Sequence, residues 1–234
     1  MYLAGMTAHT LRSREAFSRA LLRLVRHAFA FQVLVAAPAL AQVRGGGGLP
    51  PRDEWQRVPD IIAALGITEG QRVADIAAGQ GYLTKPLARA VGKSGRVYAV
   101  EISPDARQAL TDLAARESLT NVEVVAGTET DPKLPAQVDG AVILNSYHEL
   151  TEYKAILAAI LRALRPGGRL VLVDNTSLAG HESTREGQVR RHAIDPSFVA
   201  AELRAAGFEI ANRQDGFIAQ PFAQWLIVAR RPLR

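Results

Sequence analysis

The chain has 234 residues, of which 48% are hydrophobic and 22% charged, a balance typical of globular proteins with a buried core. It contains no cysteine, which excludes disulfides, thiolate metal sites and cysteine nucleophiles. Residues 1–41 hold five arginines and one acid, so residues 42–234 carry a net charge of only +1. A body this close to neutral lacks the positive field that a phosphate backbone requires, and we expect no nucleic-acid partner.

Residues 1–41 have the features of an export signal. An arginine-bearing segment precedes the apolar stretch Ala28 to Ala37, and Ala39-Leu40-Ala41 forms the small-x-small pattern of a cleavage site. The apolar stretch is too short to span a bilayer as a helix. We predict a signal peptide and an exported, periplasmic protein that meets a membrane only through this leader. A transit peptide, an uncleaved amphipathic anchor, or a misassigned start that would leave the protein cytoplasmic are the alternatives.

The remaining chain divides into a linker and one domain. Residues 42–51 hold four consecutive glycines and two prolines and predict a flexible linker. Over residues 52–234, short apolar runs alternate with helical patterns, which is typical of a parallel sheet built from βαβ units. In chain order, we predict a helix over 60–65, a strand over 72–77, a helix over 82–91, a strand over 96–102, a helix over 103–115, strands over 122–126 and 140–144, a helix over 151–164, a strand over 169–174, a helix over 195–206, and strands over 208–212 and 225–229.

The end of the domain departs from the βα repeat. The last two predicted strands are joined by a connection too short for another helix, whereas parallel strands need a crossover of a dozen or more residues. These strands must therefore form an antiparallel hairpin. The predicted fold is α/β: a Rossmann-like three-layer sandwich around a mostly parallel seven-stranded sheet with an antiparallel last strand.

The stretch from Val73 to Thr84, VADIAAGQGYLT, carries the strongest functional signal. A strand ends in Asp75 and the chain turns through Gly79 and Gly81, where glycine allows a tight turn and the close approach of a ligand. This pattern resembles the acid-x-Gly-x-Gly-x-Gly loop of class I S-adenosylmethionine-dependent methyltransferases, whose glycines make room for the methionine part of the cofactor. Ala77 stands where the family usually has its first glycine. An alanine is tolerable there at negative φ and otherwise weakens cofactor binding.

Glu101, at the end of the second strand, fits the same cofactor because an acid at this position accepts hydrogen bonds from ribose hydroxyls. Dinucleotide-dependent oxidoreductases share this spacing, but their fingerprint requires Gly-x-Gly-x-x-Gly, and Thr84 replaces the third glycine. The family resemblance further implies that Thr128 and Glu129, after the third strand, lie near the adenine. A solvated loop explains these two residues almost equally well.

The segment Asn145–Leu150, NSYHEL, follows the fourth strand at the edge where open α/β sheets bind ligands. The resemblance places it beside the methyl-transfer site, with Asn145 as a further cofactor contact. His148 is the candidate base for the acceptor, because its ordinary pKa lies near neutrality. Tyr147 is expected to shape the pocket or to steer the sulfonium with its ring. Glu149 is expected either to fix the His148 tautomer or to cap the following helix.

Asp174 and Asn175, together with Asn145, are similar to the metal ligands of catechol-type methyltransferases. One carboxylate among three donors suits a hard cation poorly, and a turn explains the pair as well. We therefore predict no metal site. His181 and His192 flank a polar segment that is expected to be a surface loop near the acceptor pocket.

The resemblance covers residues 52–231 and looks closest to exported, predicted small-molecule methyltransferases of bacteria. It implies an S-adenosylmethionine-dependent transfer of a methyl group to an unidentified small-molecule acceptor. Ala77 and the export signal also fit a second class, a non-catalytic binding protein that keeps this fold. A dinucleotide-dependent oxidoreductase is the third and weakest alternative.

Overall fold

The computed structural model describes residues 50–176 and 184–234. The predicted signal peptide, residues 42–49 of the predicted linker and His181 lie outside this part of the chain. Residues 47–234 form one compact unit. Within the described residues, no helix combines the length and the apolar character needed to cross a membrane.

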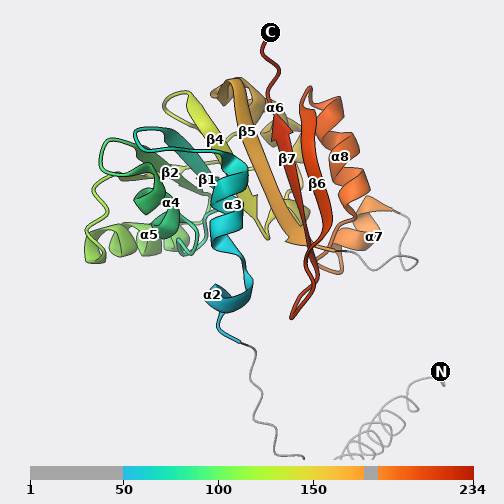
Figure 1. The fold of residues 1–234 in the computed structure, drawn as a ribbon, viewed down its shortest axis with the longest axis horizontal. Coiled ribbons are helices and arrows are strands. Elements are labelled where there is room, and N and C mark those ends of the chain that lie inside the picture. Colours follow the sequence, from blue (N-terminus) through green and yellow to red (C-terminus); the bar gives the residue numbers. More distant parts are fainter. Residues whose placement is uncertain (1–49, 177–183) are drawn as a thin grey trace, which may run out of the picture. The chain divides into compact units, whose positions relative to one another are not determined.

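The domain is built on a seven-stranded sheet with the strand order β3-β2-β1-β4-β5-β7-β6 (Figure 1). Pairing is parallel from β3 through β5, whereas β7 is antiparallel to both of its neighbours, β5 and β6. The predicted topology, including the antiparallel last strand, is confirmed. The strands are β1 (Arg72–Ile76), β2 (Arg96–Glu101), β3 (Val122–Ala126), β4 (Val138–Leu144), β5 (Leu164–Asn175), β6 (Glu209–Ile218) and β7 (Gln224–Arg230).

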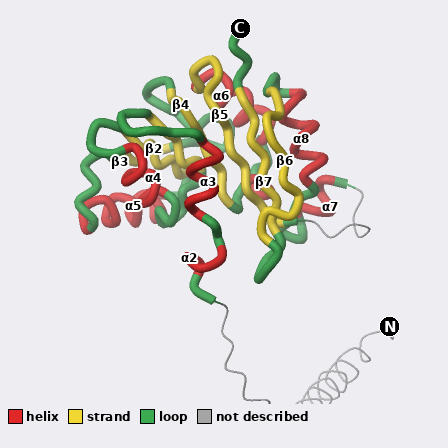
Figure 2. Tube along the Cα trace, in the orientation of Figure 1, coloured by secondary structure: helices red, strands yellow, loops and turns green. Residues whose placement is uncertain are grey.

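Helices lie on both sides of the sheet (Figure 2). Their bounds are α2 (Arg52–Trp55), α3 (Val58–Leu65), α4 (Thr84–Val91), α5 (Pro104–Arg116), α6 (Tyr153–Ala163), α7 (Arg185–Val189) and α8 (Pro196–Ala205), with a 3-10 turn, η1 (Tyr147–Glu149). Helices α3 and α4 pack on one face, and α6 and α8 on the other. Successive strand side chains point to opposite faces, so Val142 of β4 packs toward α3 and α4 while Ala141 and Ile143 pack toward α6 and α8.

The boundaries follow the sequence signals with a few differences. Ser103 caps α5, because its hydroxyl accepts a hydrogen bond from the amide of Ala106, and Gly66 ends α3 in the left-handed conformation. Strands β4 and β7 are each two residues longer than predicted, and β5 and β6 are longer still, since both stay paired across register shifts. The polar segment predicted as a surface loop contains the short helix α7.

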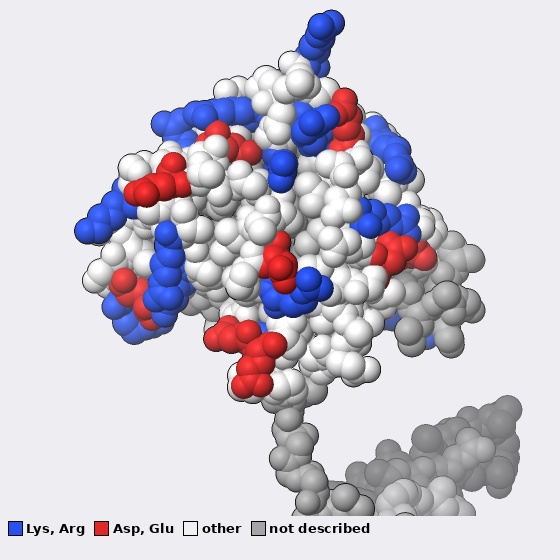
Figure 3. Space-filling model, viewed as in Figure 1, with Lys and Arg blue, Asp and Glu red and all other residues white. Residues whose placement is uncertain are grey.

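Two features of the fold position the site. The carboxyl ends of β1, β2, β4 and β5 lie at one edge of the sheet, the lower edge in Figure 1, where α2 also lies. Between β3 and β4, residues 127–137 form an irregular connection without a helix. This part of the sheet therefore has room for a cavity on the α6 side. On the face drawn in Figure 3, positive and negative side chains are interspersed.

Candidate functional site

A cavity of about 400 Å³ opens at the carboxyl ends of β1, β2 and β4. Its walls are formed by the segments that follow β1, β2, β3 and β4. The segment after β4 contributes Ser146, Glu149 and Leu150. Five residues that the sequence assigned to cofactor binding line it: Ala77, Gly79, Glu101, Thr128 and Glu129. The lining residues, from Ile76 to Ile156, lie up to 80 positions apart in the chain and meet at the predicted edge of the sheet. Five predicted residues lie outside the lining: Asp75, Gly81, Asn145, Tyr147 and His148.

The glycine loop uses its two glycines for different purposes. A Cβ placed on Gly79 would meet no atom within 4 Å, so the backbone there borders open space. A Cβ on Gly81 would collide with Leu113 and lie 3.0 Å from Leu110, both on α5. Gly81 therefore packs against α5, at a φ of 86° that favours glycine. Gly79 is the glycine that leaves room at the cavity wall for a close ligand approach.

Ala77 adopts φ 55°, so the condition of negative φ that the sequence argument set for an alanine is not met. A left-handed conformation costs a non-glycine residue about 1–2 kcal/mol because Cβ crowds the following carbonyl. Backbone hydrogen bonds directly after Ala77 hold this conformation, including one from the amide of Ala78 to the carbonyl of Val100 in β2.

Glu101 fastens the glycine loop to the end of β2. One of its carboxylate oxygens accepts a hydrogen bond from the amide of Gly79 at 2.9 Å, and the other accepts one from the amide of Ile102 at 2.8 Å. This second oxygen, Oε1, also accepts a hydrogen bond from the amide of Ser103 at 3.3 Å. An ionised carboxylate has about four acceptor positions, so Glu101 retains about one for a ligand in the cavity.

Ile102 is a cavity residue that the sequence argument missed. It is 53% exposed, although it is large and apolar, and it lines the cavity directly after Glu101. Its signal in the sequence was an apolar side chain immediately beyond a strand-end acid, at the edge where ligands bind. The side chain offers a flat apolar contact beside the Glu101 carboxylate.

Asp75 lies beneath the loop, outside the cavity lining. It is only 2% exposed, and one of its oxygens accepts a hydrogen bond from the Thr84 hydroxyl at 2.6 Å. Burial raises the pKa of Asp75 to about 7, because desolvation of the carboxylate outweighs the hydrogen bond from Thr84.

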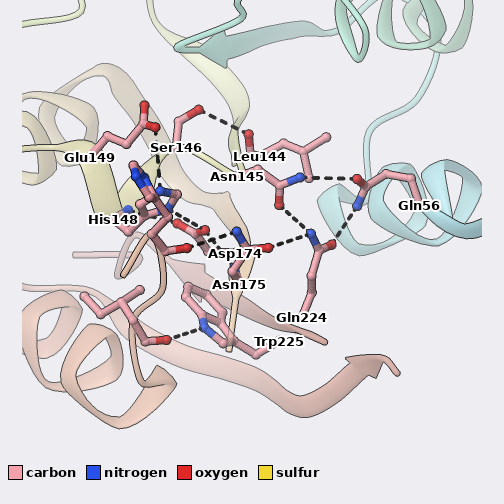
Figure 4. A network of polar contacts seen from close by, with 12 residues as sticks. Gln56, Leu144, Asn145, Ser146, His148, Glu149, Asp174, Asn175, Gln224 and Trp225 are labelled. Carbon is pink, nitrogen blue, oxygen red and sulfur yellow. Dashed lines mark hydrogen bonds and ion pairs between the residues drawn. The ribbon is translucent and has the colours of Figure 1, made fainter. Parts of the chain in front are cut away.

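Asn145 belongs to a group of four side-chain amides that we call the amide cluster: Gln56, Asn145, Asn175 and Gln224 (Figure 4). Gln224 donates to Asn145 at 2.8 Å and to Asn175 at 3.2 Å, and Gln56 donates to Gln224 at 2.8 Å. The cluster ties α2 to the ends of β4 and β5 and the start of β7. Both ends of the Asn145 amide are thus bonded within the cluster, and the side chain lies outside the cavity lining. The sequence had predicted a cofactor contact for this residue.

His148 is held by Asp174, at the end of the neighbouring strand β5. The Nδ1 atom of His148 lies 2.8 Å from one Asp174 oxygen, and the backbone amide of His148 donates to the other at 2.9 Å (Figure 4). Burial lowers the pKa of His148, but the hydrogen bond and charge of Asp174 and the charge of Glu149 outweigh this, so the pKa is raised above its ordinary value. With Nδ1–H donated to Asp174, Nε2 of a neutral His148 carries a free lone pair.

The tautomer of His148 is therefore fixed by Asp174 and not by Glu149, which corrects one of the two expected roles. The Oε1 atom of Glu149 lies 3.6 Å from His148 Nε2, and its side chain is 62% exposed. The other role is not observed either, because no side chain caps α6. Glu149 instead lines the cavity beside Nε2.

Tyr147 does not line the cavity, which corrects the prediction of a pocket-shaping ring. Its side chain is fully buried in the core between the sheet, α6 and α8, and its hydroxyl donates to Glu202 at 2.6 Å. Arg185 forms an ion pair with the same carboxylate at 2.7 Å. Successive residues of the tight turn η1 point in different directions, so Tyr147 enters the core while Glu149 faces the cavity.

Known proteins resemble the chain in sequence and in fold. Residues 73–168 match a family model described as a methyltransferase domain. A curated relative, the ubiquinone/menaquinone biosynthesis C-methyltransferase UbiE of Erwinia tasmaniensis, is 32% identical over 127 residues, which are 51% of this chain and 48% of the relative. The chain thus spans about half the length of the curated relatives it matches.

Two solved structures share the fold. A SAM-dependent methyltransferase from Aquifex aeolicus superposes with a TM-score of 0.66 at 22% identity, covering 78% of this chain and 93% of that one. The 4+2 cyclase SpnF superposes with a TM-score of 0.65 at 19% identity, covering 76% and 81%.

We expect Ala77→Gly to stabilise the protein by about 1 kcal/mol, because it removes the left-handed strain at φ 55°. The greater conformational freedom of glycine in the unfolded chain offsets part of this gain. Denaturant unfolding of the variant checks this. Ala78→Gly, next in the chain and not among the residues with positive φ, is the control and should be neutral or destabilising. A lower stability of Ala77→Gly would contradict the strain argument.

We expect Asp75 to make stability depend on pH. Its folded pKa, about 7, lies above the unfolded value of 3.8, so its contribution is fully present below pH 3.8 and is lost as the pH rises toward 7. Relative to Asp75→Asn, which stays neutral, the wild type should lose up to about 1.4 kcal/mol per pH unit in this window and then level off. Unfolding measured from pH 4 to 8 tests this, and parallel curves for both proteins would refute it.

Proposed function

We propose that this chain, which carries a class I S-adenosylmethionine-dependent methyltransferase domain, transfers the methyl group of that cofactor to a small-molecule acceptor. The observation that carries the proposal is the cavity at the carboxyl edge of the sheet, in which the predicted cofactor residues meet Ser146 and Glu149. Its volume, about 400 Å³, is in the range of small-molecule sites.

The residues present fit the cofactor. Glu101 keeps about one acceptor position for a ribose hydroxyl, and the exposed Ile102 beside it offers an apolar surface for the adenine. Open space at Gly79 leaves room for the methionine part. Glu129, exposed at the cavity wall, is available to accept a hydrogen bond from the adenine amine, whereas the Thr128 hydroxyl is already bonded to the backbone of Asp131.

The acceptor is activated at the other end of the cavity. Bound S-adenosylmethionine supplies an electrophilic methyl group, so the protein has to align a nucleophile behind it and remove that nucleophile's proton. We assign the proton removal to Nε2 of His148, which Asp174 orients through Nδ1. Glu149, beside Nε2 at the cavity wall, completes the acceptor side.

A second candidate function is a binding protein that holds the cofactor without transferring its methyl group. The left-handed Ala77 in the cavity wall favours it, because a methyl group there narrows the space left for a ligand. The fold also occurs in SpnF, which is described as a 4+2 cyclase, so the fold by itself does not specify the reaction.

Calorimetric titration of S-adenosylmethionine and S-adenosylhomocysteine into the purified chain tests the cofactor. We expect saturable binding that Glu101→Gln weakens by roughly tenfold or more, because an amide replaces one acceptor oxygen of a charged hydrogen-bonding group. Glu123→Gln, on the exposed side of β3, is the matched control and should bind as the wild type does.

Absence of binding by folded wild-type protein would refute the proposal. To separate the two functions, S-adenosylhomocysteine release is then measured with pools of small-molecule hydroxyl, amine and carbon acceptors. Release that is lost in His148→Gln supports methyl transfer. Binding without release from any pool supports the second candidate.

We also propose that the protein is exported by residues 1–41. The arginine-bearing segment, the apolar stretch and the Ala39-Leu40-Ala41 pattern support this. A fusion of residues 1–50 to a phosphatase that is active only after translocation should be active and processed. Ala41→Tyr should block processing, because a large side chain does not fit the cleavage site, and Leu34→Arg should abolish activity by interrupting the apolar stretch. An inactive wild-type fusion would overturn the proposal.

A further inference from the structure

Three side chains with metal-binding atoms converge beside the cavity wall: His148, Glu149 and His192. Of these, Glu149 lines the cavity. One ligand atom from each lies within 4.8 Å of the other two. The His148 and His192 rings meet edge to face with centroids 5.7 Å apart. His192 lies in the turn after α7, so the three residues come from two segments more than forty positions apart in the sequence.

We propose that His148, Glu149 and His192 bind one divalent transition-metal ion of the zinc type. Two imidazole nitrogens and one carboxylate are a donor set that such ions prefer, whereas calcium and magnesium prefer sites made of oxygen. These ligands differ from the three that the sequence analysis considered for a metal: Asn145, Asp174 and Asn175. The side chains of those three residues form hydrogen bonds within the chain. The sequence argument predicted no metal site at all.

The buried carboxylate of Asp174 prepares His148 for this role. Asp174 is fully buried and accepts hydrogen bonds from Nδ1 of His148 and from the amides of His148 and Asn175. A histidine that ligates a metal almost always donates its other ring N–H to such a group, which fixes the tautomer and raises the basicity of the ligating nitrogen. The hydrogen bond from Nδ1 to Asp174 thus leaves Nε2, which lies 3.6 Å from Glu149, as the ring nitrogen that can ligate an ion.

The backbone of His192 is held in an uncommon conformation. Its φ is 54°, and its carbonyl accepts a hydrogen bond from the Asn175 side chain at 3.1 Å while its amide donates to Val189 at 2.9 Å. Strained backbone of this kind persists where the surroundings fix it, and it concentrates at functional sites. Since Asn175 directly follows Asp174, the end of β5 anchors both histidines.

A small closure is needed to seat an ion. Tetrahedral ligands at about 2.1 Å from zinc lie about 3.4 Å from one another. His148 Nε2 and Glu149 Oε1 are already 3.6 Å apart, and no ligand atom is further than 4.8 Å from another. Glu149 and His192 are exposed, so their side chains can move in by about an ångström while the buried His148 stays in place.

Three protein ligands leave one position of a tetrahedral ion open, as in catalytic zinc sites. Glu149 lines the cavity, so this position faces it. On the premise of the proposed function, the open position takes a hydroxyl of the acceptor, whose pKa the ion lowers so that its proton passes to water. In the metal-loaded protein, the lone pair on Nε2 would hold the ion, and the ion would replace His148 as the group that activates the acceptor. The acceptor class would then be hydroxyl compounds.

The test is a zinc titration of the full chain, stripped of metal with a chelator, in competition with a chromogenic chelator. We expect one zinc ion per chain with micromolar or tighter affinity, and with cobalt the absorption of a tetrahedral site. His192→Gly removes one ligand at an exposed position where glycine suits the backbone, and should weaken binding at least tenfold and abolish the cobalt spectrum. Glu152→Gln, an exposed carboxylate outside the site, should leave both unchanged.

His148→Ala should also lose the ion. Because this substitution removes a side-chain partner of the buried Asp174 and destabilises the fold, the test rests on His192→Gly. Absence of stoichiometric binding, or equal binding by His192→Gly and the wild type, would overturn the proposal. Binding of S-adenosylmethionine to the metal-free chain is measured in a separate titration. Cofactor binding without zinc binding would overturn the metal site alone, whereas absence of cofactor binding would overturn the proposed methyl transfer.

Discussion

The parallel pairing of β1, β2, β4 and β5 is the constraint on which the site depends. Because these strands run in the same direction, their carboxyl ends meet at one edge of the sheet, where open α/β folds bind ligands. Two strands end in functional side chains, Glu101 of β2 and Asp174 of β5. The glycine loop and η1 directly follow the ends of β1 and β4. Each of these groups therefore lies at the edge without a long intervening loop.

Hydrogen bonds from one strand end to the next make this edge rigid. Glu101 at the end of β2 holds the loop that follows β1, and Asp174 at the end of β5 holds the turn that follows β4. The amide cluster adds α2 and β7 to the same framework. Three residues with uncommon positive φ, Ala77, Asn145 and His192, lie at this edge. Such strain is maintained only when neighbouring contacts fix the backbone.

The two ends of the cavity differ in how they are assembled. The cofactor end is made by a continuous loop and two strand ends, with carboxylate and backbone groups around open space at Gly79. At the other end, η1 borders the cavity through Glu149, and behind it the end of β5 and the turn after α7 surround a histidine whose tautomer is set by a buried carboxylate. In the proposed function, a cofactor common to many enzymes occupies the first end, and the second end is the part that would select a particular acceptor.

The sequence by itself determined the order of the main strands and helices, the antiparallel last strand and five of the residues that line the cavity. These follow from periodicity, turn residues and a local glycine motif, all of which act over a few neighbouring residues. Only the tertiary structure decided that Gly81 serves packing, that Tyr147 lies in the core, and that Asp174 rather than Glu149 orients His148. It also brought Gln56 against Gln224, 168 positions away, and His192 against His148. Side-chain direction in a tight turn and contacts between distant segments are set by packing, which a local pattern does not encode.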